Sequence, residues 1–147
     1  MMKKRNDNGV IKRILVAVDS SKESNAAVRM ASNIARALDA EVALIHVVEI
    51  EELPTLIAEA EDKEHEELGQ LVLGSSLKLA RVEGIDAKLV LRKGHPAGQI
   101  LRFTSEYKPN LIVMGSRGMT GAKGILMGSV SMTVSRKAAC SVIVVRT

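Results

Sequence analysis

The sequence predicts an α/β fold: a single doubly wound parallel sheet of five strands in the order 3-2-1-4-5, with helices on both faces. Strand-like apolar runs alternate with stretches of helical period, which favours a parallel sheet with helical crossovers. The first and fourth runs are short and fully apolar, as central strands should be, while the third alternates like an edge strand. The length of 147 residues and the apolar content of 46% match one domain.

The first part of the chain predicts two strands with a helix between them. Residues 10–19 and 42–48 are the strands, because each holds a continuous apolar run. The helix starts near Ser20 to Glu23, which follow the S-x-x-E pattern of a capping box. Its buried face is expected on residues at one-face helical spacing: Ala27, Met30, Ala31, Ile34 and Leu38.

Residues 49–84 leave two interpretations open. Pro54 suits a helix start, and apolar residues further along keep a helical period. The mostly acidic run 59–67 fits either a solvated helix face or a mobile loop, and Gly69 and Gly74 weaken the case for an unbroken helix.

The rest of the chain returns to clear alternation. The predicted elements are a strand over 87–91, a helix from Pro96 to about Tyr107, a strand over 111–114, a helix marked by Val130, Val134 and Ala138, and a strand over 141–146. Domain 10–147 therefore follows a polar segment, residues 1–9, that has no period and is expected to be a mobile tail.

Composition argues against several functional classes. The net charge is +4, but the basic residues are scattered and there is one Phe, one Tyr and no Trp, so we expect no nucleic-acid partner. The sequence has no run of about 18 apolar residues and no signal-peptide core, so we expect no membrane partner and a cytoplasmic location. The single cysteine, Cys140, excludes an internal disulfide.

The pattern G-x-x-G-x9-G-S, formed by Gly115, Gly118, Gly128 and Ser129, carries the chemistry. It lies between an apolar strand and a helix start, an arrangement that binds phosphate in many α/β proteins. In the predicted strand order the sheet reverses between the strands that end near Asp19 and Gly115, and ligands bind at such switch points. The sequence therefore predicts one nucleotide crevice.

The chain resembles the universal stress protein family over residues 10–147. The resemblance rests on segments 19–21, 44–48, 94–96, 113–118, 128–131 and 140–145. The glycine motif is similar to that of the family's ATP-binding branch.

This resemblance implies a ligand and a set of roles. The ligand is ATP or AMP, which can carry Mg²⁺. Gly115 and Gly118 would lie along ribose and phosphates, with Met114 near the ribose. The remaining implied contacts are phosphate at Gly128, Ser129 and Val130, adenosine beside Ala17 and Asp19, and adenine at the backbone of Val47.

Simpler roles compete with these. Asp19 could merely help to cap the first helix, and Ser129 could cap the fourth. Arg117 and Lys123 could screen phosphate charge or simply be solvated. His46, His65 and His95 are scattered and show no metal-ligand spacing.

Three functions remain open at the level of sequence. The first is an adenine-nucleotide-binding stress-response regulator. The second is an enzyme with slow ATP hydrolysis, although the chain has no P-loop pattern and no motif that places a catalytic residue. The third is an interaction protein whose site stays empty. The apolar strand from Ser141 to Arg146 is predicted at a sheet edge, where pairing with a second copy would give a homodimer, as the resemblance also implies.

Overall fold

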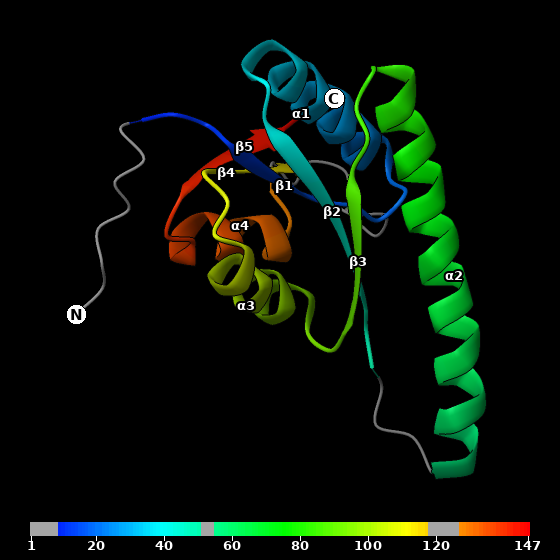
Figure 1. Ribbon diagram of the computed structural model, residues 1–147. Coiled ribbons are helices and arrows are strands. Elements are labelled where there is room, and N and C mark those ends of the chain that lie inside the picture. The colour runs from blue at the N-terminus through cyan, green and yellow to red at the C-terminus, as the bar shows by residue number, and fades with distance from the viewer. Residues whose placement is uncertain (1–8, 51–54, 118–126) are drawn as a thin grey trace.

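Strands and helices alternate along the chain; the strands form a single sheet, and the helices cover both of its faces (Figure 1). The computed structural model describes residues 9–50, 55–117 and 127–147. The elements are β1 (Arg13–Ala17), α1 (Lys22–Leu38), β2 (Glu41–Val48), α2 (Thr55–Val82), β3 (Lys88–Lys93), α3 (Pro96–Tyr107), β4 (Leu111–Gly115), α4 (Ser129–Lys137) and β5 (Ser141–Val145). The predicted tail, residues 1–9, lies outside the described residues except for Gly9.

The sheet is parallel and five-stranded, with the order β3-β2-β1-β4-β5, so the predicted fold class and strand order are confirmed. Strands β1 and β4 are its centre, and their register pairs Ala17 with Met114. The carboxyl ends of these two strands therefore lie side by side at the switch point.

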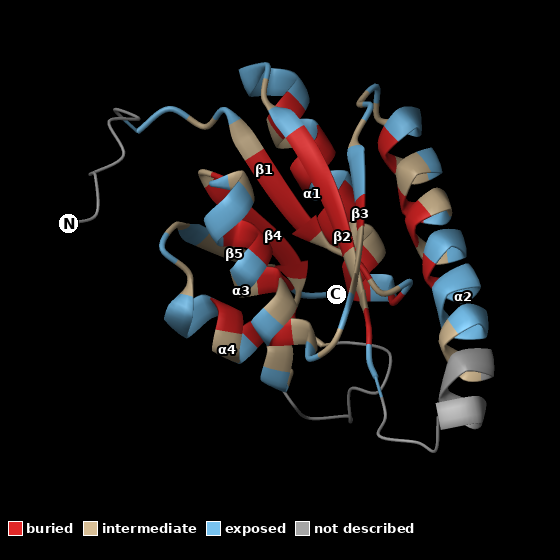
Figure 2. Cartoon of the chain, turned by 60° about the horizontal axis from the view of Figure 1, so that its bottom comes forward, coloured by how far each residue is buried: buried red, intermediate tan, exposed pale blue. Residues whose placement is uncertain are grey.

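The sheet separates two apolar layers (Figure 2). Successive side chains of a strand point to opposite faces, so Ile14 and Val16 pack under α1 and α2 while Leu15 packs under α3 and α4. Because both faces are covered, the central strands are apolar throughout, as a doubly wound sheet requires.

Helix α1 corrects part of the predicted buried face. Met30 is 40% exposed and Leu38 is 51% exposed. Ala27 and Ala31 are fully buried as predicted, and the buried face continues through Val28 and Ala35, which were not predicted. The small alanine side chains let the helix lie close to the sheet.

Helix α2 settles the alternatives for residues 49–84 in favour of an unbroken helix from Thr55 to Val82. Gly69 does not interrupt it. A Cβ at Gly69 would lie 2.8 Å from Leu91 Cδ1 and 3.1 Å from Val48 Cγ2. The glycine thus allows close contact between α2 and the neighbouring strands β2 and β3.

Candidate functional site

A cavity of about 610 Å³ opens at the carboxyl ends of β1 and β4, a size typical of small-molecule sites. The site residues predicted from sequence that fall in the described part of the chain all line it: Ala17, Asp19, Val47, Met114, Gly115, Gly128, Ser129 and Val130. Gly118, the remaining predicted residue, lies outside the described residues, as does Lys123. The strand end and the helix start that the glycine motif joins are thus walls of one cavity.

The start of α1 forms one side of the cavity and is capped by a side chain of its own segment. Ser21 is the N-cap residue, and its Oγ accepts a hydrogen bond from the backbone N–H of Ser24 at 3.0 Å. Ser24 Oγ in turn accepts from the N–H of Asp19 at 3.1 Å. Asp19 Oδ1 accepts from the N–H of Ser21 at 2.9 Å, so Asp19 both lines the cavity and holds the helix start.

The predicted capping box is wrong by one residue. Ser20 precedes the N-cap and has a φ of 66°, a conformation that few non-glycine residues adopt. The N3 position is therefore Ser24, and Glu23 makes no reciprocal capping bond. The Glu23 carboxylate instead contacts Arg117 and Thr147.

The start of α4 forms the opposite side and lacks a side-chain cap. Its N-cap is Gly128, and among the described residues no side chain accepts a capping hydrogen bond from the first N–H groups. Ser129 is the first helical residue, so it is not the cap that one interpretation of the sequence allowed. The N–H groups of Ser129, Val130 and Ser131 belong to the first turn, where helical N–H groups have no partner within the helix. With the helix dipole they favour an anion at this end.

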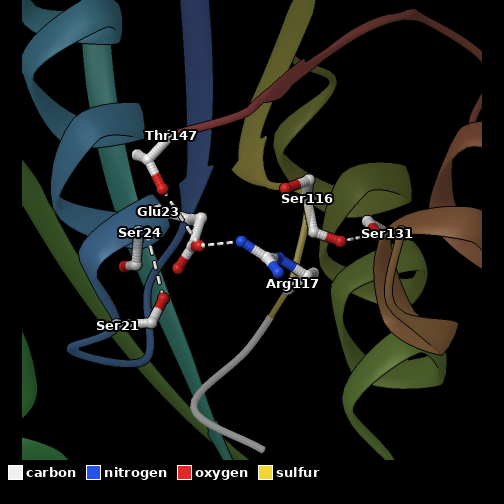
Figure 3. A network of polar contacts seen from close by, with 7 residues as sticks. All are labelled: Ser21, Glu23, Ser24, Ser116, Arg117, Ser131 and Thr147. Carbon is white, nitrogen blue, oxygen red and sulfur yellow. Dashed lines mark hydrogen bonds and ion pairs between the residues drawn. The ribbon is translucent and has the colours of Figure 1, made fainter. Parts of the chain in front are cut away.

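Ser131 fixes the position of this open helix start. Its Oγ donates to the carbonyl of Ser116 at 2.8 Å and contacts the carbonyl of Gly128 at 3.0 Å (Figure 3). The N–H of Gly128 also donates to the Ser116 carbonyl. The N–H of Ser116 donates to Val145 of β5 at 2.8 Å. Ser116, the first residue after β4, therefore anchors both α4 and the edge strand β5.

Gly115 has a structural reason to be glycine that the sequence did not reveal. A Cβ at this position would lie 2.7 Å from Glu23 Cβ and 2.9 Å from the Glu23 carbonyl carbon. The end of β4 thus touches the first turn of α1 directly. Gly115 lines the cavity, but the backbone of α1 is what excludes a side chain there.

An ion pair joins the start of α1 to the segment that follows β4. Arg117 Nη2 lies 3.0 Å from Glu23 Oε1, and the Thr147 hydroxyl donates to the same oxygen at 3.0 Å (Figure 3). A hydrogen bond from the backbone N–H of Glu23, that of Thr147 and the charge of Arg117 together hold the pKa of the Glu23 carboxyl below its usual value. Arg117 is therefore paired with a carboxylate rather than solvated.

Strand β2 forms the third wall. His46, Val47 and Glu49 line the cavity, together with Pro96 and Ile100 of α3. His46 Nδ1 donates to the carbonyl of Val18 at 2.7 Å, since a carbonyl can only accept. This bond fixes the chain between β1 and Asp19, so His46 is a wall residue of the cavity.

In the described part of the chain, no group of three or more His, Cys, Asp or Glu residues is arranged to hold a metal ion. Among the same residues, no helix is both long and apolar enough to cross a membrane.

Comparison with known proteins identifies the family. The pattern that defines the universal stress protein family matches residues 11–146. The chain belongs to the universal stress protein family. It is 38% identical over 146 residues to a universal stress protein of Methanocaldococcus jannaschii, a match that covers 97% of this chain and 86% of the relative.

Two solved structures of this family contain adenine nucleotides. A universal stress protein of Archaeoglobus fulgidus in complex with dAMP is 27% identical, with a TM-score of 0.67 over 92% of this chain and 98% of its own. A universal stress protein in complex with cAMP is 25% identical, with a TM-score of 0.73 over 92% and 97%.

The prediction from sequence missed several contacts that hold the cavity together. Ser116 and Ser131 anchor α4, and Glu23 pairs with Arg117 although 94 positions separate the two. No local pattern links Glu23 with Arg117. Only the strand order, which brings the ends of β1 and β4 together, could have suggested that α1 and the residue after β4 meet.

Proposed function

We propose that this chain is a regulatory protein of the stress response. It would bind an adenine nucleotide, ATP or AMP, and act as a homodimer. The proposal rests on one observation. The start of α4, which has no side-chain cap among the described residues, and the end of β4, where Gly115 has no side chain, line the same cavity. Nucleotide complexes of two family members support the same ligand class.

The cavity suggests how the ligand lies. Phosphate would accept hydrogen bonds from the N–H groups of Ser129 and Val130, beside Gly128, where the helix dipole favours an anion. The ribose would lie along Met114 and Gly115.

The base would then reach the β1 and β2 side of the cavity. Ala17 offers a small side chain there, and Val47 offers backbone groups to the edge of an adenine. Asp19 would face the ribose hydroxyls, because a carboxylate close to the phosphates would repel them. When the ligand is ATP, its phosphates would coordinate Mg²⁺.

Binding to the native protein is tested by thermal unfolding and calorimetry. At about 100 times its dissociation constant, a nucleotide stabilises the native state by about 2.7 kcal/mol, which raises the melting temperature by about 5–10 °C. We expect this shift with AMP or ATP and a smaller one with GMP or CMP. Mass spectrometry of ligand that co-purifies identifies the nucleotide held in the cell.

The same samples separate the proposal from its two rivals. Phosphate release from Mg-ATP at about 1 s⁻¹ or faster would indicate an enzyme rather than a nucleotide-holding protein. Absence of a shift with every adenine nucleotide at millimolar concentration would indicate an interaction protein with an empty site.

The homodimer proposal rests on the open edge of β5. Within the described residues this strand pairs with β4 alone, and Val142, Ile143 and Val144 are half-buried at the edge. Antiparallel pairing with the β5 strand of a second copy would cover it.

A charge at this edge tests the homodimer. Val144→Lys would place like charges near each other across the two-fold axis, so we expect a monomer in analytical ultracentrifugation. Val82→Lys is the control, since Val82 is 80% exposed on α2, far from this edge in the sheet order. A dimer that survives Val144→Lys would exclude this edge as the interface.

A further inference from the structure

Arg117 lies between the two helix starts that face each other across the cavity (Figure 3). It is the only Lys or Arg among the described residues that line this cavity, whereas Asp19 and Glu49 contribute carboxylates. A phosphate at the start of α4 would therefore find one side-chain cation nearby in the described wall. That cation is already bound to Glu23.

Glu23 is fixed in place as an anion. Its side chain is 11% exposed, and the one oxygen that Arg117 contacts also accepts the Thr147 hydroxyl. It lies in the first turn of α1, where the helix dipole favours a negative charge. The Thr147 contact comes from another segment than Arg117, so it holds the carboxylate in place if the guanidinium turns toward a ligand.

We propose that Glu23 limits how many phosphates the nucleotide site accepts: it competes with the ligand for Arg117 and repels each added phosphate charge. This inference rests on the proposed nucleotide function and names the residue that sets its preference. A nucleotide with one phosphate can use the N–H groups of α4 alone. Each further phosphate brings charge that Arg117, while paired with Glu23, does not compensate.

The size of the effect follows from Coulomb's law. Two unit charges about 8 Å apart in a water-like medium change a binding constant by about two- to threefold per charge, and more in a less polar surrounding. Removing the charge of Glu23 should therefore strengthen binding in proportion to the phosphate number. Adenosine, which has no phosphate, should be unaffected.

Calorimetric titration of the full chain with adenosine, AMP, ADP and ATP, without divalent cations, tests the proposal. Glu23→Gln keeps the shape of the side chain and an oxygen for Arg117 and Thr147 while removing the charge. We expect unchanged adenosine affinity and a gain of about two- to threefold per phosphate charge. Asp39→Asn is the charge-matched control, since Asp39 is exposed at the other end of α1 with a φ of 54° that Asn also adopts. It should leave all four affinities as in the wild type.

The double variant Glu23→Gln/Arg117→Gln restores the wild-type net charge and removes both members of the pair. We expect Glu23→Gln to add less affinity to Arg117→Gln than to the wild type, because the competition for Arg117 is then absent and the repulsion alone remains. Equal affinity gains for adenosine and ATP, or unchanged affinities in Glu23→Gln, would overturn the inference while leaving the proposed function intact. Absence of binding by the wild-type protein to all four ligands would overturn both.

Discussion

The starts of α1 and α4 face the same cavity, yet they differ in whether a side chain caps their unpaired N–H groups. At α1, Ser21 caps the helix, Ser24 and Asp19 complete the network, and Glu23 adds an acidic group to the first turn. At α4 the N-cap is Gly128, no side chain of the described residues caps the helix, and no acidic residue lies in the first turn.

This difference predicts where an anion binds. At α1 the protein itself supplies an acceptor for the Ser24 N–H, and a nearby carboxylate repels an anion. The start of α4 is held in position by Ser131 and has no side-chain cap among the described residues, so an external phosphate could accept from its N–H groups. The following changes break or sharpen this contrast.

The largest expected effect comes from separating α1 from β4. Gly115→Ala would place a Cβ within 2.9 Å of the Glu23 carbonyl carbon, and the backbone of α1 would have to move. We expect a loss of about 2–3 kcal/mol in unfolding free energy and a melting temperature lower by about 5–10 °C. Gly74→Ala is the control, because its Cβ meets nothing within 4 Å in the described structure and alanine favours a helix. Equal stability of the two variants would refute the close contact.

The second-largest effect is expected from a variant that makes the start of α4 resemble that of α1. Ser129→Asp would supply an acidic first turn, which the helix dipole stabilises by about 0.3–1 kcal/mol while the carboxylate repels phosphate. We expect AMP to bind about 30-fold more weakly or worse in calorimetry, with no loss of thermal stability. Ser75→Asp on the exposed surface of α2 controls for net charge. Unchanged AMP binding in Ser129→Asp would exclude α4 as the phosphate site.

A smaller effect separates the two serines as caps. Ser21→Ala removes the side chain that accepts from Ser24 and should cost about 1 kcal/mol in urea unfolding. Ser129→Ala removes no cap and should change stability by less than about 0.5 kcal/mol. A larger loss in Ser129→Ala than in Ser21→Ala would reverse the comparison.

The smallest effect concerns acid. The folded-state pKa of Glu23 lies below the usual 4.5, so its ionised form adds stability that is complete above that pH and disappears as pH falls through the folded-state pKa. The stability difference between wild type and Glu23→Gln should be constant from neutral pH down to about 5 and shrink below 4.5. Denaturant unfolding at a series of pH values measures it, and a difference that grows in acid would contradict the assignment.

Local patterns predicted most of the fold because each strand has its own apolar run and each crossover its own helical period. Strand order followed from which runs are wholly apolar, and that order brought Asp19 and Gly115 to one crevice. What could not be predicted depends on contacts between distant segments. Glu23 looked like a capping residue because it stands three positions after Ser20, but the φ of Ser20 and the hydrogen bond from the Ser24 N–H to Ser21 Oγ place the cap one residue later.

The position of α1 on the sheet was similarly hidden. The predicted face combined Ala27 and Ala31 with Met30 and Leu38, but only the two alanines are buried, and the face continues through Ala35. Gly115 shows the same limit, since its reason to be glycine is the backbone of a helix far away in sequence. Sequence spacing reveals periods along one element but not the distance between two.

The most direct test of the account follows the backbone amides of the two helix starts by NMR during titration with AMP, and with inorganic phosphate as a second probe. The account predicts saturable chemical-shift changes that are largest at Ser129, Val130 and Ser131, with smaller changes at Lys22 and Ser24 of the capped helix. Changes that centre on the start of α1, or no saturable change at α4, would contradict it.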